Sequence, residues 1–138
     1  PVLAGNITAN FVRNIWSSSV IFCGHFAEGS HTFDEKDCQD ESKGQWYYRQ
    51  ILGSCNFSGN NLMHIMSGHL SFQVEHHLFP DIPSVRYPEM AKQVQAICKK
   101  YDIPYNTAPM STQYFSVIKK MFNNSFPPKN ELKMKNAI

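Results

Sequence analysis

Two adjacent histidines near the middle of the chain are the residues best suited to chemistry. His76 and His77 lie in the segment SGHLSFQVEHHLFPDIP (Ser67–Pro83), which also contains Gln73. On a helix, residues three and four positions apart share a face, so Gln73, His76 and His77 would converge. Neighbouring side chains point about 100° apart around a helix, so the two histidines could grip one metal ion or two adjacent ions. Imidazole suits iron, zinc and copper, and the spacing therefore permits a metal site without selecting the metal.

A single helix over Asn60–His77 is expected to carry these residues. Pro80 would end it. On this helix His69 lies one turn before Gln73 on the same face. Its apolar positions form one stripe: Leu62, Ile65, Met66 and Leu70.

The other predicted elements are also helices, which makes the predicted fold class all-α. Ile7–Phe26 is mostly apolar but interrupted by polar residues, and no window of 18 apolar residues exists. A buried helix of a soluble domain and a membrane helix explain this segment about equally well. Shorter helices are expected over Gln45–Leu52, stopped by Gly53, over Pro88–Tyr101 and around Gln113–Phe122.

Charge and cysteine content narrow the possible partners. Acidic residues concentrate in residues 28–43, and basic residues predominate after Arg86. The basic end could contact anionic lipid, an acidic redox partner or a phosphorylated carrier, or it could be an ordinary solvated surface. No groove-reading motif accompanies the lysines, so we expect no nucleic-acid binding. The cysteines are far apart without a CxxC pair, which favours a reducing, cytosol-facing location over a disulfide framework.

The segment QVEHHLFP resembles the third histidine box of membrane-bound fatty acyl desaturases, in the form that begins with glutamine. The resemblance covers residues 10–110 approximately, and its other segments are similar to the C-terminal region of bacterial acyl-CoA desaturases. These segments are IFCGHF (Ile21–Phe26), GQWYYRQILGS (Gly44–Ser54), SGHLSFQVEHHLFPDIPSVRYPEMA (Ser67–Ala91) and ICKKYDIPY (Ile97–Tyr105).

This resemblance implies that residues 1–138 are the C-terminal portion of a single desaturase domain. The fold would be part of a helical membrane bundle with a cytosolic helical cap that bears a di-iron site. The protein would be an integral membrane protein, with this segment mainly on the cytosolic face. The expected parts are the last membrane helix (5–26), a loop and amphipathic segment (27–59), the cap with the histidine box (60–122) and a flexible tail (123–138).

The resemblance also implies roles for individual residues. His76 and His77 match the paired iron ligands of the box, and His25 resembles the extra histidine that the family supplies from its last membrane helix. Gln73 occupies the first position of the box, where an amide is a poorer ligand and could instead bind water or orient a neighbour. Glu75 could hydrogen-bond a ligand imidazole or be a surface carboxylate.

Four other polar residues have weaker expectations. We expect His69 to line the site, with metal contact as the alternative, because relatives carry small or amide residues there. His64 lies off the ligand face and is expected in packing or at the surface. His31 is expected to be exposed in the acidic loop, and Asn56 could support the site or cap a helix.

The implied reaction uses two iron ions and O2 as co-substrate to remove two hydrogens from a fatty acyl chain, leaving a cis double bond. The substrate would be a fatty acyl-CoA or an acyl-lipid. No GxGxxG motif is present for a flavin or nicotinamide, so electrons would come from a carrier such as cytochrome b5, ferredoxin or a flavin reductase. Lys92, Lys99 and Lys100 could dock this carrier or an acyl-CoA phosphate.

Two alternatives to desaturation stay open at this point. A similar di-iron site could hydroxylate, epoxidise or form a ketone, because the ligands do not distinguish these outcomes. The second alternative is a non-enzymatic soluble helical module, in which the histidine pair binds zinc or only packs. The family's HxxxH and HxxHH boxes are absent from this sequence, and we therefore expect residues 1–138 alone to be inactive.

Overall fold

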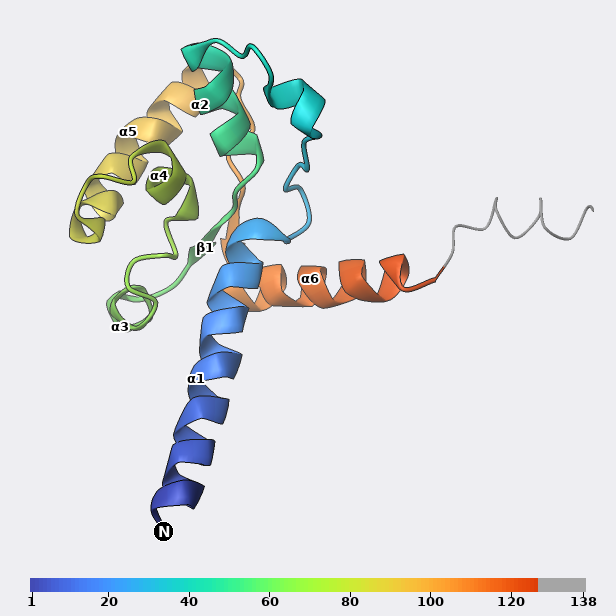
Figure 1. The fold of residues 1–138 in the computed structure, drawn as a ribbon. Coiled ribbons are helices and arrows are strands. Elements are labelled where there is room, and N and C mark those ends of the chain that lie inside the picture. The colour runs from blue at the N-terminus through green and yellow to red at the C-terminus, as the bar shows by residue number, and fades with distance from the viewer. Residues whose placement is uncertain (127–138) are drawn as a thin grey trace, which may run out of the picture.

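The computed structural model of the protein describes residues 1–126, so most of the tail predicted over 123–138 lies outside the described residues. Helices dominate, as predicted (Figure 1). In chain order the elements are α1 (Val2–His25), a 3-10 turn (Glu35–Cys38), α2 (Lys43–Leu52), β1 (Asn56–Ser58), α3 (Asn61–Met66), α4 (Gln73–Leu78), a second 3-10 turn (Ser84–Arg86), α5 (Tyr87–Lys100), β2 (Thr107–Pro109) and α6 (Met110–Asn124).

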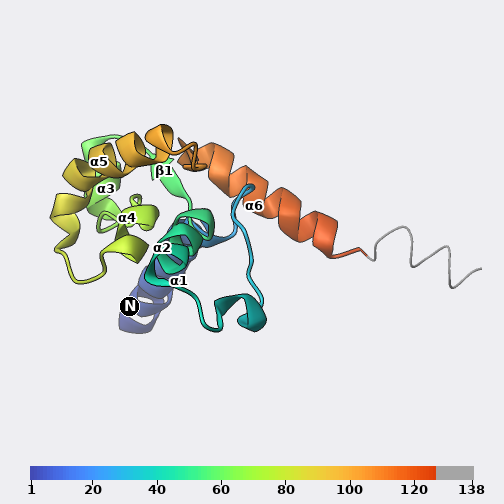
Figure 2. The same ribbon diagram turned by 90° about the horizontal axis from the view of Figure 1, so that it is seen from above.

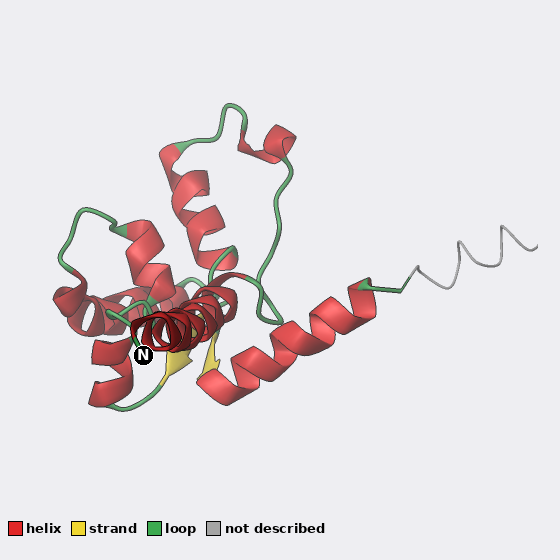
Figure 3. Ribbon diagram, turned by 60° about the horizontal axis from the view of Figure 1, so that its bottom comes forward, coloured by secondary structure: helices red, strands yellow, loops and turns green. Residues whose placement is uncertain are grey.

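The mostly helical structure agrees with the predicted all-α class, and it also contains two short strands. β1 and β2 pair in parallel as a small two-stranded sheet, drawn in yellow in Figure 3. Phe57 lies opposite Ala108 at the centre of this pairing. Strands of three residues are too short to show a periodic apolar pattern, which explains why the sequence did not reveal them.

The helix predicted over residues 5–26 is present as α1 and extends away from the other elements, with the N-terminus at its far end (Figure 1). Much of its apolar surface is exposed, including Leu3, Phe11 and Ile15. Within residues 1–126, no helix has both the length and the apolar character that crossing a membrane requires. Seen from above, α6 points away from α2, α4 and α5 (Figure 2).

The helix predicted over Asn60–His77 is wrong as a single element. Gly68 has φ +60°, and its N–H donates to the Ile65 carbonyl, while the His69 N–H donates to the His64 carbonyl over 2.7 Å. These two bonds form a Schellman motif, in which a left-handed residue satisfies the last carbonyls of a helix and ends it. The chain therefore turns between α3 and α4, and α4 begins afresh at Gln73.

Two other helices agree closely with their predictions, and one is longer. α2 begins at a capping box and its carboxyl end is capped by Gly53. α5 carries Pro88 in its first turn, where the missing N–H costs no hydrogen bond. α6 exceeds the predicted Gln113–Phe122 by one turn at its amino end.

The largest buried cluster holds α2, α4 and α5 together. It comprises Ile51, Val74, Leu78, Val94 and Cys98. The four cysteines are free thiols, as their spacing predicted. This packing places the apolar side of α4, formed by Val74 and Leu78, against α2 and α5.

Candidate functional site

Three histidines meet where the carboxyl end of α1 approaches the last turn of α4. The His25 and His77 rings have centroids 4.9 Å apart, and the His76 and His77 rings have centroids 5.9 Å apart. His25 is the last residue of α1, whereas the other two end α4. The structure thus brings together the three histidines that were expected to bind metal, from segments about 50 residues apart.

Asn56 of β1 fixes the position of α4. Its Oδ1 accepts from the Val74 N–H over 2.8 Å, and its Nδ2 donates to Glu75 Oε2 over 2.8 Å. The hydroxyl of Tyr105 donates to the other Glu75 oxygen over 2.9 Å. Because these bonds tie the first turn of α4 to β1 and to the segment before β2, they set the rotation of the helix that carries His76 and His77.

Both expectations for Glu75 are wrong. Its side chain has 0% exposure, so it is no surface carboxylate, and its partners are Asn56 and Tyr105 rather than an imidazole. Burial raises the pKa of the Glu75 carboxyl, and hydrogen bonds from Asn56 and Tyr105 oppose that rise in part. Sequence spacing could not reveal this buried group, because its partners are far away along the chain.

Each histidine of the pair contacts a side chain from a different helix. His77 Nδ1 lies 3.1 Å from Gln50 Oε1, and His76 Nδ1 lies 3.1 Å from the hydroxyl of Tyr87. An amide oxygen only accepts hydrogen bonds, so His77 donates from Nδ1 and keeps its lone pair on Nε2. Gln50 and Tyr87 were not predicted as site residues, since nothing in their local spacing connects them to the histidines.

Gln73 lies beside His25, with 3.2 Å between the amide nitrogen and Nε2 of the imidazole. The amide therefore donates to the lone pair of His25, and the role of Gln73 in the site stays a prediction. Gly24 makes this approach possible: a Cβ atom there would lie 2.9 Å from Gln73 Cγ. Gln73 is itself buried.

Burial favours the neutral imidazole at His25 and His77. Burial, then the neighbouring His25 and His76, lower the pKa of His77 to about 4. Burial and then His76 also lower the pKa of His25. Neutral imidazole nitrogens are the form that binds transition metals, so the donor chemistry of His25, His76 and His77 fits iron. Within residues 1–126, no three His, Cys, Asp or Glu side chains are close enough together to hold one ion.

Comparison with known proteins identifies the family. The family model described as fatty acid desaturase matches residues 2–109. The chain belongs to the fatty acid desaturase family. An NADPH-dependent stearoyl-CoA 9-desaturase from Mycobacterium tuberculosis is 46% identical over 127 residues, which are 92% of this chain and 30% of that protein. Fatty acid desaturase 3 from Bos taurus is 35% identical over 81 residues, 59% of this chain and 18% of that protein. No solved structure matches significantly.

The desaturase chain thus spans about 30% of the length of the first of these relatives. The resemblance that the histidine box indicated is confirmed at the level of the family. The roles of individual residues are not tested by these similarities and stay predictions.

Several residues that were considered for this desaturase site lie apart from the three histidines. His69 has φ +61° in the turn between α3 and α4, so it does not share a helical face with Gln73 as predicted. His64 contacts the Ser71 hydroxyl over 2.7 Å, in keeping with the packing role expected of it. His31 is exposed, as expected. The α5 lysines (Lys92, Lys99 and Lys100) are all exposed too.

Proposed function

We propose that this chain is part of an O2-dependent fatty acyl desaturase, an oxidoreductase of lipid metabolism, in which His25, His76 and His77 help to hold two iron ions. The observation that carries the proposal is the meeting of His25 with the histidine pair in a member of the desaturase family. When bound, the iron supplies the activation of O2 for removing two hydrogens from the acyl chain.

The residues of this chain would hold and orient that centre. His77 offers the lone pair of Nε2, since its Nδ1 donates to Gln50 Oε1. His76 would offer Nε2 in the tautomer in which its Nδ1 donates to the Tyr87 hydroxyl. His25 would offer its own Nε2 once the Gln73 amide, which donates a hydrogen bond to that atom here, moves away. Gln73 would then stay beside the site as an orienting group, because an amide is a poorer ligand than an imidazole.

The substrate proposed for the whole protein is a fatty acyl-CoA, in preference to an acyl-lipid. The 46% identical relative is named a stearoyl-CoA 9-desaturase, which supports a long saturated acyl-CoA and a double bond at the ninth carbon. That relative is also named NADPH-dependent. Because this sequence has no GxGxxG motif, we propose that a carrier such as cytochrome b5, ferredoxin or a flavin reductase delivers the electrons, either as a separate partner or as an upstream domain.

We further propose a membrane location with this segment on the cytosolic face. Exposed apolar side chains along α1, such as Leu3, Phe11 and Ile15, support contact with lipid or with other apolar helices. His25 is the last residue of α1, whereas Leu3 lies in its first turn. The remaining iron ligands would come from histidine boxes outside this sequence, so isolated residues 1–138 should show no iron-dependent turnover.

Fatty-acid profiling by gas chromatography–mass spectrometry tests the proposal. A host without desaturase activity would express the complete protein that contains this chain, either unchanged or as a His76→Ala/His77→Ala double variant. His31→Ala, at an exposed position, is the matched control. We expect a new unsaturated acid that is lost only in the double variant. A hydroxylated product would keep the site and change the reaction, whereas no product with iron and a reductase supplied would favour a non-enzymatic helical module.

A further inference from the structure

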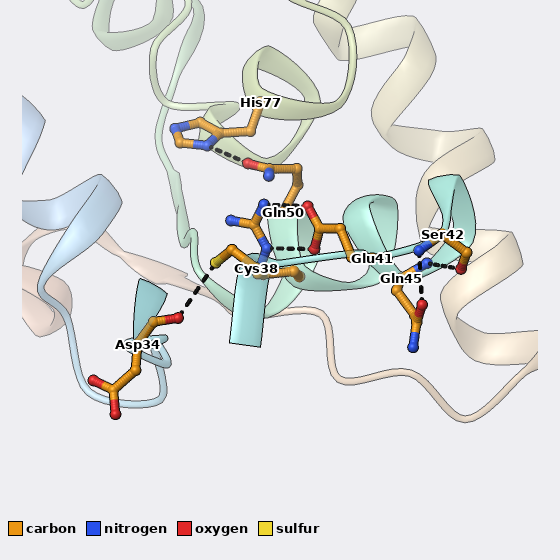
Figure 4. Close-up of polar contacts among 8 residues, drawn as sticks. Asp34, Cys38, Glu41, Ser42, Gln45, Gln50 and His77 are labelled. Atoms are coloured by element: carbon orange, nitrogen blue, oxygen red, sulfur yellow. Dashed lines mark hydrogen bonds and ion pairs between the residues drawn. The ribbon is translucent and has the colours of Figure 1, made fainter. Parts of the chain in front are cut away.

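Gln50 holds His77 in one tautomer. The carboxamide oxygen of Gln50 lies 3.1 Å from His77 Nδ1, as the dashed line in Figure 4 shows. Because this oxygen cannot donate, the bond forms only when Nδ1 carries the proton, and it leaves the lone pair of His77 on Nε2. In a metal-binding histidine, the hydrogen bond at one ring nitrogen decides which nitrogen is available to the metal.

Side-chain hydrogen bonds tie the helix that carries Gln50 to the residues directly before it. At its start, Ser42 Oγ accepts from the Gln45 N–H over 3.3 Å, and Gln45 Oε1 accepts from the Ser42 N–H over 2.8 Å (Figure 4). Near its end, Arg49 donates from Nε to Glu41 over 2.8 Å and forms a second bond to the same carboxylate. A bidentate pair of this kind restricts the geometry of both side chains.

The packing on the other side of α2 adds to this rigidity. Ile51, next to Gln50, is 8% exposed and belongs to the buried cluster that contains Val74 and Leu78 of α4. The Ser54 hydroxyl donates to the backbone carbonyl of Gln50 over 2.6 Å. The donor and the acceptor of the contact with His77 therefore belong to two helices that pack against each other, which keeps the contact in register.

Tyr87 does not impose the same choice on His76. A phenolic hydroxyl can donate or accept, so the 3.1 Å contact with His76 Nδ1 is compatible with either tautomer. Of the two contacts to the histidine pair, only the one from Gln50 selects a tautomer.

We propose that Gln50 is a positioning residue that presents Nε2 of His77 to the metal, an inference that rests on the proposed function. Removing its acceptor should weaken metal binding without unfolding the protein. Supporting hydrogen bonds to metal-binding histidines are typically worth about 10–100-fold in metal affinity.

The test uses the complete protein that contains this chain, in three variants. Gln50→Met keeps the length of the side chain and removes the acceptor, whereas Gln50→Glu retains an acceptor oxygen. Gln93→Met is the matched control, since Gln93 is an exposed glutamine of α5. The readouts are the affinity for Fe²⁺ from competition with a chelator, the thermal midpoint, and the tautomer of His77 from ¹⁵N NMR of the metal-free protein.

We expect Gln50→Met to bind Fe²⁺ about 10–100-fold more weakly and to lose the Nδ1–H tautomer of His77. Gln50→Glu and Gln93→Met should match the wild type in their affinity for Fe²⁺ and in the tautomer of His77. All three variants should keep similar thermal midpoints. Equal affinity and an unchanged tautomer in Gln50→Met would overturn the inference. A wild-type protein that binds no Fe²⁺ would overturn the proposed function, and the tautomer measurement alone would then decide whether Gln50 positions His77.

Discussion

Removing one hydroxyl at Tyr105 should destabilise the protein measurably. In Tyr105→Phe, Glu75 Oε1 loses the donor that lies 2.9 Å away, and Asn56 Nδ2 loses one of its two acceptors. Glu75 has 0% exposure, so no water can replace the lost donor without opening the structure. A buried polar atom that loses its hydrogen-bond partner costs about 1–3 kcal/mol, and we expect the free energy of unfolding to fall by about that amount.

The measurement is a denaturant titration of the complete purified protein, with Tyr101→Phe as the control. Tyr101 lies four positions earlier and is 64% exposed, so losing its hydroxyl should change the free energy of unfolding by less than about 0.5 kcal/mol. If the two variants are equally stable, Glu75 is not held in the way described. A large loss in Tyr105→Phe alone would confirm that buried polar contacts, and not apolar packing only, fix α4.

Three further predictions concern the surroundings of the histidines. Gly24→Ala places a Cβ atom 2.9 Å from Gln73 Cγ and should lower the free energy of unfolding by about 1–3 kcal/mol. In the control Gly5→Ala the new Cβ meets nothing within 4 Å, so this variant should be neutral or more stable by up to about 1 kcal/mol. The thermal midpoints of the two variants test this difference. Because the pKa of His77 falls from 6.5 to about 4, the unfolded chain takes up the proton first, so the metal-free protein should lose stability as the pH falls through this window. That slope should shrink in His77→Asn, and an unchanged slope would exclude His77 as its source. Reversing the charge of the α5 lysines should raise the apparent Michaelis constant for the electron carrier or for acyl-CoA. Steady-state kinetics, with the carrier and then acyl-CoA varied, measure the two constants. If neither constant changes, the prediction is wrong.

The elements that the sequence predicted well are those whose signals are local. α2 stops at Gly53 and α5 starts at Pro88, and both residues act within one turn of the helix end. Gly68 is local too, but the apolar stripe continues past it, and only the left-handed backbone at Gly68 shows that the helix ends. The short strands and their pairing gave no signal, because the partners of β1 are about 50 residues away.

The candidate site divides in the same way. His76 and His77 were predicted from a motif that is contiguous in sequence, and His25 followed from the resemblance to the family. The residues of other elements that support these histidines are not close to them in sequence and belong to no motif. Gln50 reaches His77 from another helix, and Glu75 is buried by contacts from Asn56 and Tyr105. Such contacts depend on how the helices pack, and no spacing along the chain encodes them.

The position of β1 at the centre of these contacts bears on the order in which the protein assembles. The backbone of Asn56 donates to the Asn106 carbonyl, and its own carbonyl accepts from Gln113 of α6, 57 residues further along the chain. Contacts between distant residues form late, because a long loop must close first. During synthesis, all three histidines leave the ribosome well before Gln113, so the strand that orients α4 lacks its last partner until α6 emerges. Until then the histidines are present in the nascent chain, but the support that holds them together is incomplete.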